Sequence, residues 1–459
     1  MDAVTAYLEA RREQHLEQLK DLLRFPSIST DPGRREDVRA CARHLQDSLR
    51  ALGFADARLH ETAGHPILTA ARRTVAGAPT VLFYGHYDVQ PVDPLELWTH
   101  PPFEPALEGD RLYARGVADD KGQVFAHIKA LEALLAEDGE LPLNVVLLIE
   151  GEEEIGSPNL VPFLKENRAL LAADCAVISD TAMFAEGRPS ITYALKGLAY
   201  LELEVEGPSH DLHSGSFGGP VVNPLNTLAD LLSSLKDARG RVAVEGFYDE
   251  VLELSGEERR AFAALDFDEA AFRAGLNVEG LRPEEGFTVL EHLWARPTCD
   301  VNGFVGGFTG EGAKTVLPAR ARAKVSFRLV PNQDPEQVGD LVEAHWRRLL
   351  PEGARLAVTR HHAGRPALTP IDHPAVKAGM AALEKGFGVR PVYQREGGSI
   401  PIVADFDEIL GLKTVLMGFG LPDSRCHSPN ENLSLENIFG GMRAAAWFYR
   451  LLPEYLAKS

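Results

Sequence analysis

The stretch TVLFYGHYDVQP, residues 80–91, joins a buried strand to a pair of chemically active side chains. An apolar run of strand-forming residues ends at Gly85, and His86 and Asp88 follow it. Residues two apart in an extended chain project to the same side, so the imidazole and the carboxylate leave the strand end together. The pair suits a metal ligand and its charged partner, although two such residues alone do not specify a metal site.

Comparable apolar strand patterns occur at residues 144–150 and 175–180, and a helical pattern at residues 121–136 separates the first of them from residues 80–91. Two further helical patterns, at residues 3–24 and 36–52, open the chain. Strands that are apolar on both faces and alternate with helices are typical of parallel sheets covered on both sides. We therefore predict an α/β fold whose mainly parallel central sheet is flanked by helices.

The pattern changes after Lys196. The segments LAYLELEVEG and AKVSFRLVP alternate apolar with polar residues, which predicts half-exposed strands, and helical patterns lie between and after them. The helix and buried-strand patterns of the first part then return toward the end of the chain. These observations predict a first domain in two parts, residues 1–196 and 369–459, interrupted by an inserted α+β domain at residues 197–368.

The composition excludes several classes of function. A formal net charge of −20 over 459 residues argues against binding to nucleic acid or to anionic membranes. No apolar run is long enough to span a bilayer, and the chain opens with mixed charged and apolar residues, unlike a signal peptide. The four cysteines show no CxxC spacing, so neither a disulfide framework nor a thiolate zinc site is indicated. We expect a cytoplasmic protein.

Four further clusters of polar residues follow predicted strands or loops. They are RGVADDKG with Asp119 and Asp120, EGEEEIGS with Glu152, Glu153 and Glu154, ISD ending in Asp180, and CHSPNENL with His427. Taken singly, each has an ordinary structural explanation: a helix N-cap, a solvated charge run, a turn or an exposed loop histidine. Three adjacent carboxylates at a strand end, however, repel one another unless a cation or a proton lies between them.

Together, these clusters indicate a metal centre. Two imidazoles and several carboxylates at strand ends match the ligands of two divalent metal ions, with zinc as the first candidate and manganese or cobalt as alternatives. A carboxylate that binds no metal can take a proton from water that the ions make more acidic. The predicted reaction is therefore hydrolysis.

Nine segments of the chain resemble the motifs of one enzyme family. They are GHYDVQPVDPLELWTHPPFEP, RGVADDKG, EGEEEIGS, ISD, DLHSG, GAKTVLP, FRLVPN, REGGSIP and HSPNEN, spread from residue 85 to residue 432. They resemble the M20 family of metallopeptidases, and within it the cytosolic nonspecific dipeptidase, or carnosinase-like, branch. The resemblance covers both predicted domains.

The resemblance implies a role for each matching residue of the first domain. His86, Asp119, Glu154, Asp180 and His427 match the metal ligands, with Asp119 as the bridging carboxylate. Glu153 matches the general base and later proton donor, and Asp88 matches an acid that orients the site. The family also implies a cis peptide bond between Asp119 and Asp120.

The inserted domain resembles the lid and dimerisation domain of the family. By this resemblance His213 reaches the active site of the partner subunit in a homodimer and stabilises the oxyanion of the tetrahedral intermediate. Thr315, Arg328 and Ser399 match substrate contacts, and Arg328 is suited to gripping a peptide carboxylate.

The implied function is hydrolysis of dipeptides or short peptides by a dinuclear metal-dependent enzyme. One alternative is an M20 amidohydrolase that removes the acyl group from N-acyl amino acids. Another is a catalytically inactive, peptide-binding homologue.

Overall fold

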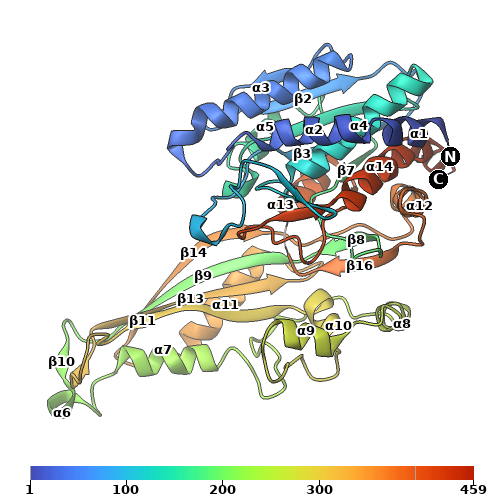
Figure 1. Ribbon diagram of the computed structural model, residues 1–459. Coiled ribbons are helices and arrows are strands. Elements are labelled where there is room, and N and C mark those ends of the chain that lie inside the picture. The colour runs from blue at the N-terminus through green and yellow to red at the C-terminus, as the bar shows by residue number, and fades with distance from the viewer. Residues whose placement is uncertain (1, 399, 459) are drawn as a thin grey trace. The chain divides into compact units, whose positions relative to one another are not determined.

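The structure is a computed structural model that describes residues 2–398 and 400–458 (Figure 1). The chain forms two compact units. The first unit extends to Tyr193 and also contains Thr369–Gln394 and the chain from Asp405 onward. The second unit contains Ala194–Leu368 and Arg395–Ala404.

The first unit is built on a mixed sheet with the strand order β1-β2-β6-β3-β7-β17-β8-β15, and β16 also pairs with β8. Strand β15 Ala367–Leu368 and the last two residues of β8 and of β16 belong to the second unit. The strands are β1 Arg58–His60, β2 Ile67–Arg72, β3 Thr80–His86, β6 Asn144–Glu150, β7 Cys175–Ile178, β8 Ser190–Leu195, β16 Val392–Glu396 and β17 Thr414–Leu416. The four central strands β6, β3, β7 and β17 are parallel. Strand β1 is antiparallel to β2, β2 to β6, and β8 to β17. The predicted α/β fold with a mainly parallel central sheet is confirmed.

Helices cover this sheet. The helices of the first unit are α1 Ala3–Ala10, α2 Arg12–Leu23, α3 Arg35–Ala51, α4 Lys121–Asp138, α5 Leu160–Glu166, α12 Pro374–Phe387 and α14 Leu435–Leu456. The first four residues of α13 Pro401–Asp405 belong to the second unit. Helix α4 packs on β3, α12 on β17, and α3 on β1 and β2, while α14 contacts both α4 and α12. Every residue of β3 and β6 is buried as a result, which explains why both strands are continuously apolar.

The predicted helix at residues 3–24 is wrong in one respect, because it is two helices. Arg11 leaves the α-helical region with φ −110° and ψ 15°, and α1 and α2 meet there. Helix α1 packs against both α4 and α14, whereas α2 packs against α4 (Figure 1). Tertiary contacts of this kind override a continuous helical pattern.

A small three-stranded sheet lies beside the site described below. It has the order β18-β5-β4, from β4 Ala106–Glu108, β5 Arg111–Tyr113 and β18 Asn432–Ser434. Strand β18 pairs with β5, so residues more than 300 positions apart in the chain become neighbours. This pairing brings the loop before α4 close to the loop between β17 and β18.

The second unit contains an antiparallel sheet with the order β11-β13-β9-β14. Its strands are β9 Gly197–Glu206, β11 Thr298–Gly306, β13 Arg320–Leu329 and β14 Arg355–Gly364. Buried and partly exposed residues alternate along β9 and β13, as the period-two pattern predicted. Helices α7 Pro224–Ser233 and α11 Pro335–Leu349 lie along one side of the sheet (Figure 1). The buried side chains between them, among them Trp346 and Phe327, form a separate core.

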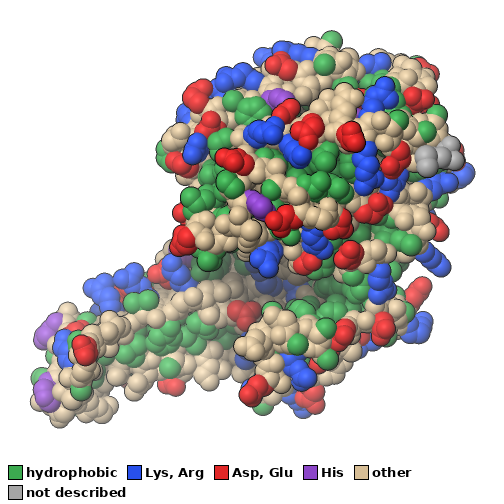
Figure 2. Space-filling view, viewed as in Figure 1, with side chains coloured by type: hydrophobic (Ala, Val, Ile, Leu, Met, Phe, Trp, Pro, Cys, Tyr) green, Lys and Arg blue, Asp and Glu red, His purple; other side chains and the backbone are tan. Residues whose placement is uncertain are grey.

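The second unit has further short elements. They are β10 Leu212–His213, β12 Val316–Leu317, β15 Ala367–Leu368, α6 Ser214–Phe217, α8 Gly256–Ala263, α9 Glu269–Gly275 and α10 Val289–Ala295. Within the described part of the chain, no helix combines the length and apolar composition that a membrane span requires. Acidic and basic side chains are interspersed on the face of the first unit that Figure 2 shows.

Candidate metal centre

The predicted ligands of the first unit lie where its parallel strands end. His86 is the last residue of β3, Glu153 and Glu154 follow β6, and Asp180 follows β7. The carboxyl ends of parallel strands meet at one edge of the sheet, so these side chains converge. Asp119 precedes α4, and His427 comes from the loop between β17 and β18.

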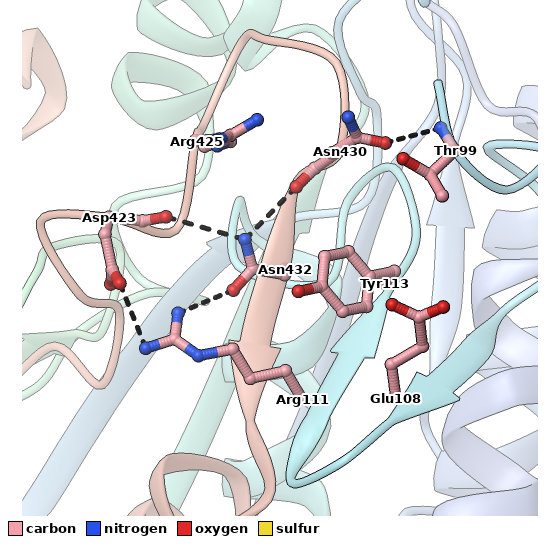
Figure 3. Close-up of a pocket in the computed structure, with 8 residues that line it drawn as sticks. All are labelled: Thr99, Glu108, Arg111, Tyr113, Asp423, Arg425, Asn430 and Asn432. Atoms are coloured by element: carbon pink, nitrogen blue, oxygen red, sulfur yellow. Dashed lines mark hydrogen bonds and ion pairs between the residues drawn. The ribbon is translucent and has the colours of Figure 1, made fainter. Parts of the chain in front are cut away.

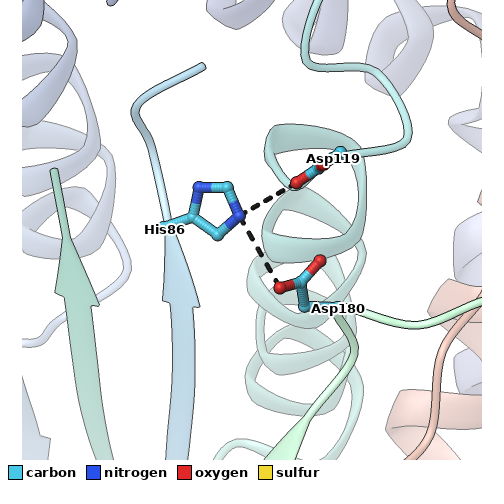
Figure 4. A group of neighbouring side chains, drawn as sticks. All are labelled: His86, Asp119 and Asp180. Atoms are coloured by element: carbon cyan, nitrogen blue, oxygen red, sulfur yellow. Dashed lines mark ion pairs between the residues drawn. The ribbon is translucent and has the colours of Figure 1, made fainter. Parts of the chain in front are cut away.

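His86, Asp119 and Asp180 form the first group of candidate ligands (Figure 4). His86 Nε2 lies 3.0 Å from Asp119 Oδ1 and 3.8 Å from Asp180 Oδ2. One ligand atom from each of the three residues lies within 4.8 Å of the others. The His86 side chain is fully buried, whereas the two carboxylates remain partly accessible.

Asp119, Glu154 and His427 form the second group. His427 Nε2 lies 2.9 Å from Asp119 Oδ2 and 3.2 Å from Glu154 Oε2. Asp119 belongs to both groups and presents a different oxygen to each histidine. One carboxylate shared by two groups of ligands is the arrangement required to bridge two metal ions.

The hydrogen bonding of His86 fits a metal ligand. Its Nδ1 lies 3.1 Å from the carbonyl oxygen of Asp88, which can only accept, so Nδ1 carries the hydrogen. In the neutral ring, Nε2 then has a free lone pair directed toward two carboxylates, and this buried nitrogen makes no hydrogen bond to a described residue. A divalent cation between Nε2 and the carboxylates would satisfy all three groups, so the donor set fits a metal centre.

The pKa values of His86, Glu153 and His427 also fit a metal centre. Hydrogen bonds to Asp119 and Glu154 raise the pKa of His427 to about 10. Burial opposes a charged imidazole at His86, yet Asp119 and Asp88 raise its pKa well above the ordinary value. Burial raises the pKa of Glu153 well above its ordinary value. The protein alone thus holds protons at this cluster of negative charge, and bound cations would replace them.

Asp88 connects His86 to the acidic turn that follows β6. Its Oδ1 accepts a hydrogen bond from the backbone N–H of Glu153 at 3.2 Å, and its Oδ2 accepts one from the N–H of Glu154 at 3.1 Å. Asp88 Oδ1 also lies 3.4 Å from His86 Nδ1. The side chain therefore fixes the positions of His86, Glu153 and Glu154 relative to one another. The peptide bond between Asp119 and Asp120 is cis, as the family resemblance implies.

The remaining candidate residues belong to the second unit. Strands β10 and β12 bring His213 and Thr315 together, and the N–H of Ser214 donates to the carbonyl of Thr315 at 3.0 Å. Both side chains are exposed, and His213 Nδ1 accepts a hydrogen bond from Gly215 N–H. Arg328 lies near the end of β13, opposite Leu198 of β9. Ser399 lies outside the described residues.

Two residues beside the metal ligands were not singled out from the sequence. Gln90 Nε2 donates to Glu154 Oε2 at 2.8 Å and so orients a candidate ligand. Glu431 accepts hydrogen bonds from the loop that carries Asp119. The segment HSPNEN, which contains Glu431, was the only sequence signal for the second, but a loop glutamate does not reveal its partners.

A polar pocket of about 440 Å³ lies on the loop that carries His427 (Figure 3). Arg111 reaches Asp423 at 3.0 Å and Asn432 at 2.8 Å across it. Asn430 Oδ1 accepts a hydrogen bond from the N–H of Thr99 at 2.7 Å. These contacts anchor the loop on both sides of His427.

Comparison with known proteins identifies the family. Residues 82–450 match the family model described as Peptidase family M20/M25/M40. The chain is 32% identical to the Cys-Gly metallodipeptidase of Schizosaccharomyces pombe, over 96% of each chain. It is also 32% identical to the human Beta-Ala-His dipeptidase, over 98% of this chain and 92% of that protein.

A solved structure is similar over the same length. The M20 family metallo-carboxypeptidase Sso-CP2 from Sulfolobus solfataricus superposes with a TM-score of 0.85 at 38% identity, and the match covers 96% of this chain and 99% of that one. These similarities confirm the resemblance of the motifs. The chain therefore belongs to peptidase family M20/M25/M40, and it is a metallopeptidase.

Proposed function

We propose that this metallopeptidase hydrolyses dipeptides with the help of two divalent metal ions held at the end of the parallel sheet. The shared carboxylate of Asp119 carries this proposal, because its two oxygens face histidines of different ligand groups at 3.0 and 2.9 Å. His86 and Asp180 would hold one ion, and Glu154 and His427 the other. Zinc is the first candidate, with manganese or cobalt as alternatives.

The relatives support a dipeptide substrate. Two proteins that are 32% identical to this chain are named for dipeptides, Cys-Gly in one and Beta-Ala-His in the other. The proposed anchor for the terminal carboxylate is Arg328. Burial is the main cause that lowers the pKa of the neighbouring Lys196 to about 7, and the positive charges of Arg328 and Arg296 add to it. A positive potential favours an anionic group such as a peptide carboxylate.

The two ions would supply Lewis acidity, which polarises a carbonyl oxygen and makes water more acidic. The protein residues supply the proton transfers. Glu153 is the proposed base that takes a proton from the attacking water and later gives it to the leaving amine. Burial disfavours the charged form of the Glu153 carboxylate. Glu153 would therefore readily take up a proton even next to cations. Asp88 holds the Glu153 backbone in place through its N–H.

The second unit would complete the site as a lid and dimerisation domain. His213 of the partner subunit would stabilise the oxyanion, while Thr315 and Ser399 would contact the substrate. Closure of such a domain excludes bulk water from the reaction. A homodimer in the cytoplasm is the proposed form of the enzyme.

Glu153→Gln tests the proposed base. Gln has nearly the same shape but cannot take the proton, so kcat is expected to fall by at least about 100-fold. Metal content, measured by atomic emission after dialysis, is expected to remain that of wild type. Asp407→Asn, an exposed carboxylate of the same unit, is the matched control and should leave kcat unchanged. Turnover near the wild-type rate in Glu153→Gln would remove Glu153 as the base.

Trimming of longer peptides is the second candidate, because the Sulfolobus structure with 38% identity is a metallo-carboxypeptidase. A panel of dipeptides, longer peptides and N-acyl amino acids separates the possibilities. The panel is assayed with metal-stripped protein as Zn²⁺, Mn²⁺ or Co²⁺ is restored. Cleavage of dipeptides alone supports a dipeptidase, and release of C-terminal residues from longer peptides supports a carboxypeptidase. Activity confined to N-acyl amino acids would contradict both.

A further inference from the structure

Glu431 is a buried carboxylate close to the metal ligands that none of the proposed chemical steps uses. It lies in the same loop as His427 and is 0% exposed. A carboxylate is buried only where hydrogen bonds or charges compensate for the loss of water. Its partners therefore show what it does.

All of those partners lie on the loop that leads to Asp119. Glu431 Oε2 accepts from Arg115 Nη1 at 2.7 Å and from the N–H of Gly116 at 2.9 Å. Glu431 Oε1 accepts from the N–H of Ala118 at 2.9 Å and from that of Asp119 at 3.1 Å. In addition, the backbone carbonyl of Glu431 accepts from the N–H of Ala114 at 3.2 Å.

These bonds join the two loops that carry Asp119 and His427, which are both candidate ligands of the second group. One loop ends in Asp119, and the other carries His427 at a backbone φ of 60°. A non-glycine residue in this left-handed region is held there by its surroundings. From this geometry we infer that Glu431 is a positioning residue, which sets the distance between Asp119 and His427 and thereby the affinity of the metal centre.

This inference rests on the proposed metal centre and adds a residue that touches neither metal nor substrate. Partners that orient metal ligands commonly change metal affinity by about 10- to 100-fold when they are removed. A purely structural carboxylate would change stability instead. The two roles therefore differ in a measurement that does not depend on catalysis.

Glu431→Gln is the informative variant, because all four groups around the carboxylate are donors. The amide of glutamine has only one acceptor oxygen, so its NH₂ group must face two of these donors. Glu284→Gln is the matched control. Glu284 is similarly buried and accepts from Arg296 at 3.0 and 2.8 Å, but it lies in the second unit.

The measurement is Zn²⁺ binding to metal-stripped protein in competition with a chelating dye, together with the visible absorption of bound Co²⁺. Wild type is expected to bind two ions. Glu431→Gln is expected to bind Zn²⁺ about 10- to 100-fold more weakly and to show an altered Co²⁺ spectrum. Glu284→Gln is expected to keep wild-type affinity.

Glu431→Asp is a second variant that keeps the inference testable if Glu431→Gln does not fold. It keeps the charge but withdraws the carboxylate by one methylene, so its Zn²⁺ affinity should lie between those of wild type and Glu431→Gln. Wild-type affinity in both Glu431 variants, or an equal loss in Glu284→Gln, would overturn the positioning role. If wild type itself binds no metal, the proposed function fails instead.

Discussion

Asp119 is the residue at which the two halves of the candidate centre meet. Its oxygens face His86 and His427, which come from a strand end and from a distant loop. The side chain can hold this position only if the loop from Arg115 to Asp119 is itself fixed. Glu431 fixes it from one side, and close packing at the start of α4 fixes it from the other.

Gly122 provides that close packing. A Cβ at this position would lie 2.0 Å from the carbonyl oxygen of Val117, far inside contact distance. Helix propensity favours alanine over glycine by about 1 kcal/mol, but a backbone clash of this size costs more. Gly122→Ala is therefore expected to lower Tm by roughly 2–5 °C and to weaken Zn²⁺ binding at least about 10-fold.

The matched control for Gly122→Ala is Gly275→Ala at the end of α9. A Cβ added to Gly275 would have no heavy atom within 4 Å among the described residues beyond its chain neighbours and its own helix, so nothing opposes the substitution there. Calorimetry and dye competition on both variants make the comparison. Unchanged Zn²⁺ affinity in Gly122→Ala would show that the loop before α4 does not control the position of Asp119.

At the scale of elements, α4 is held on the parallel sheet by a buried histidine. His127 Nε2 lies 2.7 Å from Ser179 Oγ, and Ser179 Oγ itself donates to the carbonyl of Met417 at 2.7 Å. Nε2 is therefore the donor to Ser179, and Nδ1 accepts from the Tyr449 hydroxyl at 2.8 Å. This network connects α4 to β7 and α14 and requires a neutral imidazole.

Burial lowers the pKa of His127 to about 3. In the unfolded chain the pKa is about 6.5, so between these values the unfolded state binds the extra proton. His127 thus stabilises the fold fully above pH 6.5, and this contribution is lost as the pH falls toward 3. The slope is at most about 1.4 kcal/mol per pH unit.

Urea unfolding of metal-free wild type and His127→Gln between pH 6.5 and 5 checks this expectation. The free energy of unfolding of wild type should fall more steeply with decreasing pH, since glutamine does not titrate. Effects of all other groups largely cancel in the difference between the two proteins. Parallel curves for the two proteins would mean that His127 takes up its proton equally in the folded and the unfolded state, which contradicts a lowered pKa.

At the scale of the whole molecule, the proposal requires two subunits for one active site. If His213 acts in the partner's site, His213→Ala and Glu153→Gln should each be inactive alone. A mixed dimer would contain one site with both Glu153 and a donated His213. Refolding the two variants together should therefore restore about a quarter of wild-type activity, given random pairing.

The same mixture also tests the opposite arrangement. If His213 acted within its own subunit, no pairing of the two variants could assemble a complete site, and the mixture would stay inactive. Size-exclusion chromatography with light scattering verifies that mixed dimers have formed. Differently tagged variants allow the mixed species to be isolated before the assay.

Much of the fold could be predicted because burial leaves a direct pattern in the sequence. Strands β3 and β6 are buried at all seven positions, and both read as continuous apolar runs. Strand β11 could not be predicted in this way. It is an edge strand with mostly exposed or partly exposed residues and an irregular register near Gly303, so its sequence shows no alternation.

The candidate ligands could be predicted because they are strongly polar residues at the ends of apolar strands. Glu431 could not, since its partners are mainly backbone amides more than 300 residues away. Backbone groups are the same at every position and carry no sequence signal. The break between α1 and α2 at Arg11 could not be predicted either, because α1 packs against α14, which is far away in the chain.

The dinuclear centre is tested most directly by anomalous diffraction from crystals of the wild-type protein grown with Zn²⁺. We predict two zinc peaks roughly 3.5 to 4 Å apart, with the Asp119 carboxylate between them. His86 and Asp180 should ligate one ion, and Glu154 and His427 the other. A single peak, or peaks that Asp119 does not bridge, would contradict the dinuclear centre.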